Sequence, residues 1–430
     1  MNKPSKIVGM NGFSLIELMI GITLGLLIMT ALVTLFVNTS RTNTEMAKVN
    51  SQIENGRFAM QLLENEIVHG GFWGGYLPQF EDLTLSTAPD DAPALELPLN
   101  TVPAACLDYA SWDAADGTVD GDNSAYITKM FGIPIQAYDG VPTGCSTVVT
   151  NKKANTDVLL IRHAATCLPG VGNCEAVKAD KLYFQFSQCE NEIGAATPLL
   201  YMLAQAPAND DTSNFTLKKR GCTGTPPATA GTQADVRKFV SHIYYIRDHA
   251  VTDGDGIPTL MRTEFDVNDV SGTPTLKYKA VDPLINGIEG FRVELGIDNI
   301  SDNGTNIFTG TPKLYTQEIA WFDEENLTSP TNRGDGSPDY YKLCTTAAPC
   351  SIDELSNVVA VKIYVLARAD TPTAGYEDNK TYQLGSSDTL CSTTSTDAGC
   401  VSKILDPRFK RHVFSTTVRL NNVSSRRETP

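Results

Sequence analysis

The chain of 430 residues lacks the short motifs that mark the commonest catalytic sites. It contains no GxSxG, no HExxH, no P-loop and no GxGxxG. Its five histidines are scattered and form no spaced pair: His69, His163, His242, His249 and His412. No nucleophile with its base is visible, so we expect a protein that is not an enzyme and that needs no cofactor.

Basic residues are also in deficit. The 34 Lys and Arg residues face 50 Asp and Glu residues, which gives a formal net charge of −16. Binding along nucleic acid needs clustered Lys and Arg to replace counterions, so we predict no nucleic-acid partner. The basic residues late in the chain are interpreted as solvated surface: Arg408, Lys410, Arg411, Arg426 and Arg427.

Proline is absent between Pro4 and Pro78, so nothing interrupts a long N-terminal helix. Residues 13–37 carry a single charge, and about 20 apolar residues are enough to cross a bilayer. Residues 38–70 have apolar residues on one side only, and a glycine pair at 70–71 can end the helix. The predicted stripe consists of Met46, Val49, Ile53, Gly56, Met60, Leu63 and Ile67.

The charges around the apolar segment predict its orientation. Lys3 and Lys6 precede it and the acidic body follows, so the N-terminus should stay in the cytoplasm and the body outside it. A cleaved secretory signal would have a shorter apolar run and a small-x-small cleavage site, whereas this run ends in Leu-Phe-Val-Asn. We expect a single membrane-spanning helix.

The remainder of the chain has the character of a β-rich head. Residues 77–156 are interpreted as mostly irregular, and the aromatic residues Phe72, Trp73 and Tyr76 as a plug between the helix and the head. Together these features predict an α+β fold: a long N-terminal helix packed on mainly antiparallel sheet with long loops. The clearest predicted strands are 157–163, 181–187, 238–247, 291–297, 358–368 and 413–420.

The ten cysteines predict disulfides, since the body should lie outside the cytoplasm and no CxxC-type metal spacing occurs. Three pairs are close in sequence: Cys167 and Cys174, Cys344 and Cys350, Cys391 and Cys400. For the other four, pairing of neighbours is the simplest expectation: Cys106, Cys145, Cys189 and Cys222.

Two loops contain oxygen donors with turn glycines. They are Asp253-Gly254-Asp255-Gly256 and the segment 298–304, in which Asp298 and Asp302 lie beside two asparagines. Neither has the ligand spacing of an EF-hand, and Asp-Gly pairs are common in plain turns. We interpret both loops as turns and predict no metal site.

Glu17 lies five residues into the apolar run, where a carboxylate is costly. By itself it is either a functional group or an acid tolerated at the membrane edge, near a helix N-terminus. The surrounding residues, Gly12-Phe13-Ser14-Leu15-Ile16-Glu17-Leu18, resemble the processing signature of type IV pilins. The resemblance implies cleavage by a prepilin peptidase between Gly12 and Phe13, and methylation of the new Phe13 amine. It also implies that Glu17 pairs with the Phe13 amine of a neighbouring subunit, since both charges would otherwise be stranded in an apolar filament core.

Four segments of the head are similar to the PilW group of minor pilins. They are the Ile-Tyr-Tyr-Ile-Arg strand followed by Asp-Gly-Ile-Pro at 255–258, the segment 287–292, the strand 357–368 and the strand 414–420. The domain organisation is then a leader at 1–12, a transmembrane helix at 13–37, an amphipathic helix at 38–70 and a periplasmic head at 71–425.

This second resemblance implies a structural minor pilin of the inner membrane that later enters the pilus, at or near its tip. Its partners would be other minor pilins and the major pilin, bound through their N-terminal helices, and a tip adhesin stays open as a further partner. A minor pseudopilin of type II secretion shares the N-terminal motif and is the nearest alternative. A membrane-anchored periplasmic binding protein or hydrolase is the alternative from another class.

Overall fold

The computed structural model describes residues 14–76, 101–112, 125–195, 199–270, 273–300, 304, 306–308, 334–385, 400–401 and 406–424. The chain divides into two units, Met1–Ser51 and Gln52–Pro430. The predicted leader with its cleavage site, Gly12 and Phe13, lies outside the described residues, as does Cys391.

The first element is the α-helix α1, Leu15–His69, of 55 residues. It ends where Gly71 adopts a positive φ of 74°, a conformation that ends helices readily because glycine has no Cβ. A single long N-terminal helix was the prediction from the missing prolines, and it is confirmed.

The larger sheet of the head is antiparallel throughout the pairs described. Its path is β1-β2-β5-β3-β4, and β6 pairs with β5, β7 and β8. The 12-residue strand β5 organises this sheet, because β2 lies on one side of it and both β3 and β6 on the other. The bounds are β1 Ile135–Tyr138, β2 Val158–Ala164, β3 Leu182–Phe186, β4 Tyr201–Gln205, β5 Val236–Arg247, β6 Thr259–Val270, β7 Thr273–Tyr278 and β8 Asp282–Asn286.

A second antiparallel sheet has the order β10-β9-β11-β14, and a small ladder joins β12 to β13. The bounds are β9 Ile288–Ile297, β10 Tyr340–Lys342, β11 Val358–Arg368, β12 Tyr382–Gln383, β13 Cys400–Val401 and β14 Arg411–Arg419. Short helices connect the strands: the 3₁₀ turn η1 Tyr109–Ser111, α2 Ala125–Gly132, α3 Glu190–Ile193, α4 Ile352–Ser356 and α5 Asn421–Ser424. The predicted fold, a long helix with a β-rich antiparallel head, is confirmed.

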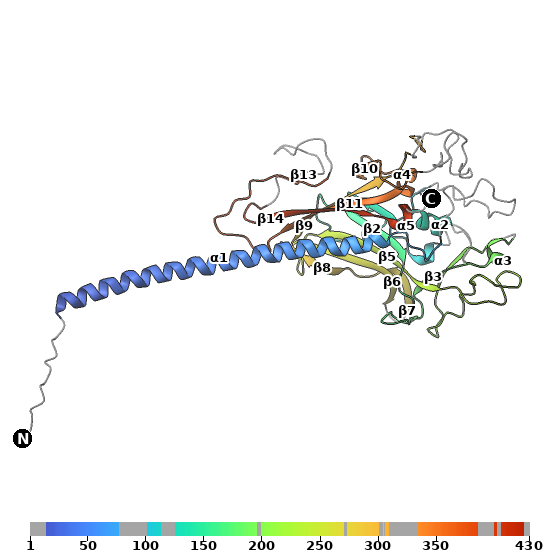
Figure 1. Cartoon of the computed structure of the whole chain (residues 1–430), viewed down its shortest axis with the longest axis horizontal. Helices are drawn as coiled ribbons and strands as arrows, with labels where there is room; N and C mark the ends of the chain where they lie inside the picture. The colour runs from blue at the N-terminus through green and yellow to red at the C-terminus, as the bar shows by residue number, and fades with distance from the viewer. Residues whose placement is uncertain are drawn as a thin grey trace, which may run out of the picture. The chain divides into compact units, whose positions relative to one another are not determined.

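Most of the buried apolar residues in the described part of the head belong to two large hydrophobic cores. In the first, the last turns of α1 pack against residues of both sheets, among them Ile363 of β11 and Leu260 of β6. Figure 1 shows these turns running between β8 on one side and β9 and β14 on the other. The second core is rich in aromatic rings and consists mainly of residues from α2 and from strands of the larger sheet. Trp73 and Tyr76 are buried in it, but the cluster contains no residue of α1. These two rings therefore pack inside the head rather than between the helix and the head, and the interpretation of the segment as a plug between them is wrong.

The segment 77–156, interpreted as mostly irregular, contains in its described part the 3₁₀ turn η1 and two longer elements, α2 and β1. Both are buried: the amphipathic α2 contributes Met130 and Phe131 to the aromatic core, and β1 covers an edge of β2. Each is too short for a periodicity to stand out among the polar residues around it.

Candidate functional site

Two local hydrogen bonds cap the N-terminal end of α1. The backbone N–H of Ser14 donates to Oε2 of Glu17 at 3.0 Å, and the N–H of Ile16 donates to the Ser14 hydroxyl at 3.2 Å. This reciprocal pattern, Ser with Glu three residues later, is close to a capping box. Glu17 is exposed in the structure and uses one of about four acceptor positions of its carboxylate in this bond. The remaining positions can accept hydrogen bonds from another chain.

The first part of α1 is long and apolar enough to cross a membrane. An 18-residue window within it has a mean hydropathy of 2.5. The hydroxyls of Thr23, Thr30 and Thr34 each donate to the backbone carbonyl four residues earlier, at 2.8 Å. These bonds satisfy the hydroxyl protons inside the helix, as a lipid environment requires. The helix could therefore anchor the chain in a membrane.

The last part of α1 docks on the head through a narrow face. The docked face differs from the predicted stripe, because Met46 and Ile53 are exposed while Gln52 is buried. Gln52 can be buried because its side-chain amide donates to the carbonyl of Ala367 in β11 at 3.1 Å. A polar side chain therefore occupies a core position. The buried residues of α1 are Gln52, Gly56, Ala59, Met60, Leu63 and Ile67.

Three of the five histidines meet at the end of this helix, although they are far apart in the sequence. The rings of His69 and His163 lie 5.7 Å apart, and Nδ1 of His242 lies 2.8 Å from Oε2 of Glu66. Burial lowers the pKa of His163 to about 4. For Glu66 burial acts in the opposite direction, but the hydrogen bond with His242 and nearby positive charges lower its pKa overall. The sequence offered no signal for this cluster, since its members come from three separate elements.

Buried ion pairs join the strands of the head. Arg292 of β9 donates to Asp157 at 2.6 Å, and both side chains are 1% exposed. Arg411 lies 2.7 Å from Glu289 and 3.4 Å from Asp378, and its side chain is also 1% exposed. The interpretation of Arg411 as solvated surface is therefore wrong: the two carboxylates compensate its charge in the interior.

Four disulfides are present in the described part of the chain, and each joins cysteines that neighbour one another along the sequence. Cys391 lies outside the described residues, so the pair with Cys400 stays a prediction. The four bonds are Cys106–Cys145, Cys167–Cys174, Cys189–Cys222 and Cys344–Cys350.

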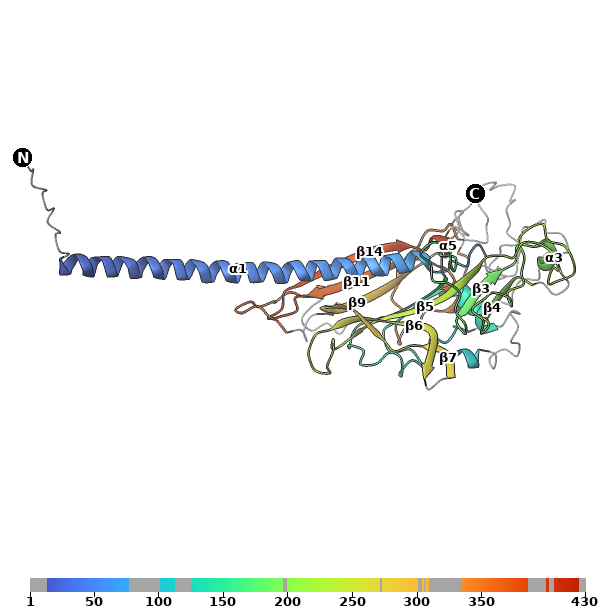
Figure 2. The same cartoon turned by 90° about the horizontal axis from the view of Figure 1, so that it is seen from below.

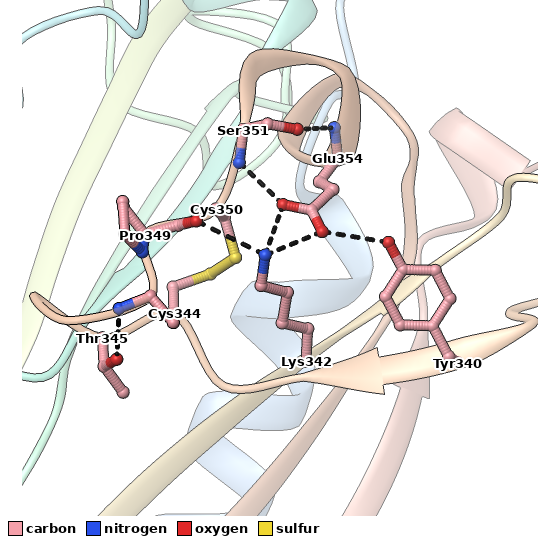
Figure 3. Close-up of a disulfide and its surroundings, with 9 residues drawn as sticks. Tyr340, Lys342, Cys344, Thr345, Pro349, Cys350, Ser351 and Glu354 are labelled. Atoms are coloured by element: carbon pink, nitrogen blue, oxygen red, sulfur yellow. Dashed lines mark hydrogen bonds and ion pairs between the residues drawn. A yellow bond between two sulfur atoms is a disulfide. The ribbon is translucent and has the colours of Figure 1, made fainter. Parts of the chain in front are cut away.

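The Cys344–Cys350 disulfide lies beside a polar junction that fixes α4 to β10. Figure 3 shows the Glu354 carboxylate between Lys342, at 2.7 Å, and the hydroxyl of Tyr340, at 3.0 Å. Ser351 caps α4 by accepting from the N–H of Glu354, while Glu354 accepts from the N–H of Ser351. The disulfide closes the loop between the strand and the helix that share this junction.

These features define a class of protein: an apolar helix able to anchor in a membrane, continuing into a disulfide-bonded, β-rich head. Residues 243–422 match the model of the PilW family, described as type IV pilus-assembly protein W. The match covers the end of β5, the strands β6, β7 and β8 of the larger sheet, all of the second sheet and the start of α5. It supports a role in type IV pilus assembly. Searches of curated proteins and of solved structures found no match.

Proposed function

We propose that the chain is a structural minor pilin rather than an enzyme. Prepilin peptidase cuts it between Gly12 and Phe13, α1 holds it in the inner membrane with the head in the periplasm, and it then enters a type IV pilus. The observation that carries this proposal is the PilW match at residues 243–422 in a chain whose apolar helix has Glu17 in its first turn.

In this proposal, α1 also joins the subunit to its neighbours when the pilus assembles. After cleavage, the Phe13 amine of one subunit pairs with Glu17 of a neighbour, so that neither charge is left alone in the apolar core of the filament. The carboxylate has acceptor positions left for this amine beyond its bond with Ser14. The partners are other minor pilins and the major pilin, and the large head favours a place at or near the tip, where it does not have to repeat along the shaft.

Mass spectrometry of the mature protein from its own host tests the processing step. The expected N-terminal peptide begins with N-methylated Phe13. An intact Met1, or a cut beyond Val37, would contradict the proposal.

Deletion of the gene tests whether the subunit serves a type IV pilus or a type II secretion system. Loss of surface pili with secretion unchanged is expected. Loss of protein secretion with normal pili would instead assign the chain to a type II secretion system, as a pseudopilin. A soluble periplasmic activity that survives removal of α1 would favour the anchored binding protein or hydrolase.

A further inference from the structure

A cluster of metal-ligating side chains lies in the loop between β5 and β6, away from α1. Nδ1 of His249 is 2.6 Å from Oδ1 of Asp248 and 4.0 Å from Oδ1 of Asp253. One donor atom from each of the three residues lies within 4.8 Å of the other two. The imidazole is 8% exposed, whereas the side chain of Asp253 is 89% exposed. The cluster therefore has a fixed nitrogen donor at its base and carboxylate oxygens toward solvent.

The loop is held in shape by a different carboxylate. Asp255 accepts hydrogen bonds from the backbone N–H groups of Ala250, Val251, Thr252 and Ile257. These bonds, led by those from Val251 and Ile257, lower the pKa of Asp255. Asp255 is thus committed to the backbone, as the interpretation of this segment as a turn requires. The acidic groups beside the imidazole are Asp248, which is hydrogen-bonded to Nδ1 of His249, and Asp253.

Two further features direct the donors toward one point. Gly254 has a φ of 83°, a left-handed conformation that turns the chain back immediately after Asp253. Arg247 directs its guanidinium at the backbone carbonyls of His249 and Ala250, not at the carboxylates. Arg247 thereby holds the backbone on both sides of the His249–Ala250 peptide.

We propose that Asp248, His249 and Asp253 bind a first-row transition-metal dication of the Zn²⁺ type. In a tetrahedral site, ligand atoms about 2.1 Å from the ion lie roughly 3.4 Å from one another. Binding therefore requires the Asp248 carboxylate to move back from its 2.6 Å hydrogen bond with Nδ1 of His249 and the Asp253 carboxylate to rotate toward it. The side chains of Asp248 and Asp253 are 50% and 89% exposed, so both can move. Imidazole nitrogen favours Zn²⁺ over Ca²⁺, which takes oxygen ligands. The ion replaces the proton on Nδ1, which passes to water, and the open face of the site is completed by water.

Calorimetric titration of the detergent-solubilised full chain with Zn²⁺ tests the site. One Zn²⁺ per chain is expected to bind. Asp253→Asn is the main variant, since this exposed side chain can change without disturbing the fold, and it should weaken binding about 10- to 100-fold. His249→Asn should do the same, with the thermal unfolding midpoint recorded to show that the variant is folded.

Matched controls are available on other elements. Asp282→Asn alters an exposed carboxylate of β8, and His412→Asn alters an exposed imidazole of β14. Both should bind Zn²⁺ as the unchanged protein does. The proposal is overturned if no saturable binding occurs, or if Asp253→Asn binds with unchanged affinity. It is also overturned if Ca²⁺ displaces Zn²⁺ at equal concentration and His249→Asn has no effect, because the imidazole would then not be a ligand. None of these outcomes depends on the role in pilus assembly.

Discussion

The ring of Phe414 in β14 lies directly against α1 at Gly56, where a methyl group would overlap the ring. Gly56 is buried in the middle of the docked face, between Gln52 and Ala59. Both views place β14 and β11 alongside this part of α1 (Figure 1, Figure 2). Glycine is a poor helix former, so its presence inside a 55-residue helix has a packing reason: the aromatic ring needs the space.

Gly56→Ala should destabilise the head even though alanine favours a helix by about 1 kcal/mol. Forcing a methyl group against the Phe414 ring costs roughly 1–3 kcal/mol. After the gain in helix propensity, the free energy of unfolding should fall by up to about 2 kcal/mol, and the thermal unfolding midpoint should fall with it. Gly25→Ala is the matched control, because a Cβ there meets nothing within 4 Å. In the double variant Gly56→Ala with Phe414→Ala the penalty of the first change should disappear. Additive effects of the two changes would show that the ring and the glycine are not coupled.

The sequence predicts best those helices and strands whose residue pattern is contained within one segment of the chain. The proline-free apolar start predicted α1, and the β-branched run at 358–368 predicted β11, because both patterns are local. The residue pattern does not predict the strand β6, because the charged residues Arg262 and Glu264 interrupt its apolar residues. Glu264 is in fact paired with Lys238 of β5 at 2.7 Å. Pairing across strands cannot be read from one segment, and the same holds for the histidines near Glu66.

The buried pair of Arg292 and Asp157 makes a strong prediction for stability. Asp157 also accepts from the backbone N–H of Val293 at 2.8 Å, so it links the start of β2 to the middle of β9. Asp157→Ala should lower the free energy of unfolding by about 3–5 kcal/mol, because it leaves the Arg292 charge buried without compensation. The exposed pair of Arg408 and Asp406 is the control, and Arg408→Gln should leave unfolding unchanged. A loss of under 1 kcal/mol for Asp157→Ala in denaturant unfolding would show that water reaches Arg292.

The lowered pKa of His163 predicts how stability depends on pH. Its pKa is about 4 in the folded chain and 6.5 in a model imidazole, so the unfolded state binds more protons between these values. Stability should therefore fall as the pH decreases from about 6.5 to about 4, by up to roughly 3 kcal/mol from this group. The lowered pKa of Glu66 adds a loss in the same direction at lower pH. Burial raises the pKa of Asp157 to about 6, and this group acts in the opposite direction between about 6 and 4. The contribution of His163 is therefore measured as the difference in thermal unfolding midpoint between the unchanged protein and a His163 variant across this range.

His163→Gln isolates the histidine contribution to this decline. The variant cannot take up a proton at this position, so as the pH decreases from 6.5 to 4 it should lose less stability than the unchanged protein does. His412→Gln is the control, since His412 is exposed and should leave the slope unchanged. An equal slope in the His163 variant and the unchanged protein would assign the acid sensitivity to other groups.

The disulfides should differ in their contribution according to the length of chain that they close. Cys106–Cys145 joins residues 39 apart, whereas Cys344–Cys350 joins residues 6 apart. In the chain-entropy model the longer loop contributes about 4 kcal/mol and the shorter about 2.4 kcal/mol. Paired Cys→Ser variants, compared by denaturant unfolding, should show this order. The reverse order would mean that the short loop mainly stabilises the folded junction around Glu354 rather than restricting the unfolded chain.

Variants of Glu17 separate its local role from its proposed role between subunits. Glu17→Gln keeps a side-chain oxygen that can accept from the N–H of Ser14 but removes the charge, whereas Glu17→Ala removes both. If Glu17 pairs with the amine of a neighbour, both variants should insert into the membrane normally and both should assemble poorly, because an unpaired buried charge costs about 3–5 kcal/mol. Immunoblots of sheared pili and of membranes measure assembly and insertion separately. Normal piliation in Glu17→Gln with a defect only in Glu17→Ala would show that the residue acts as a helix cap and not through its charge.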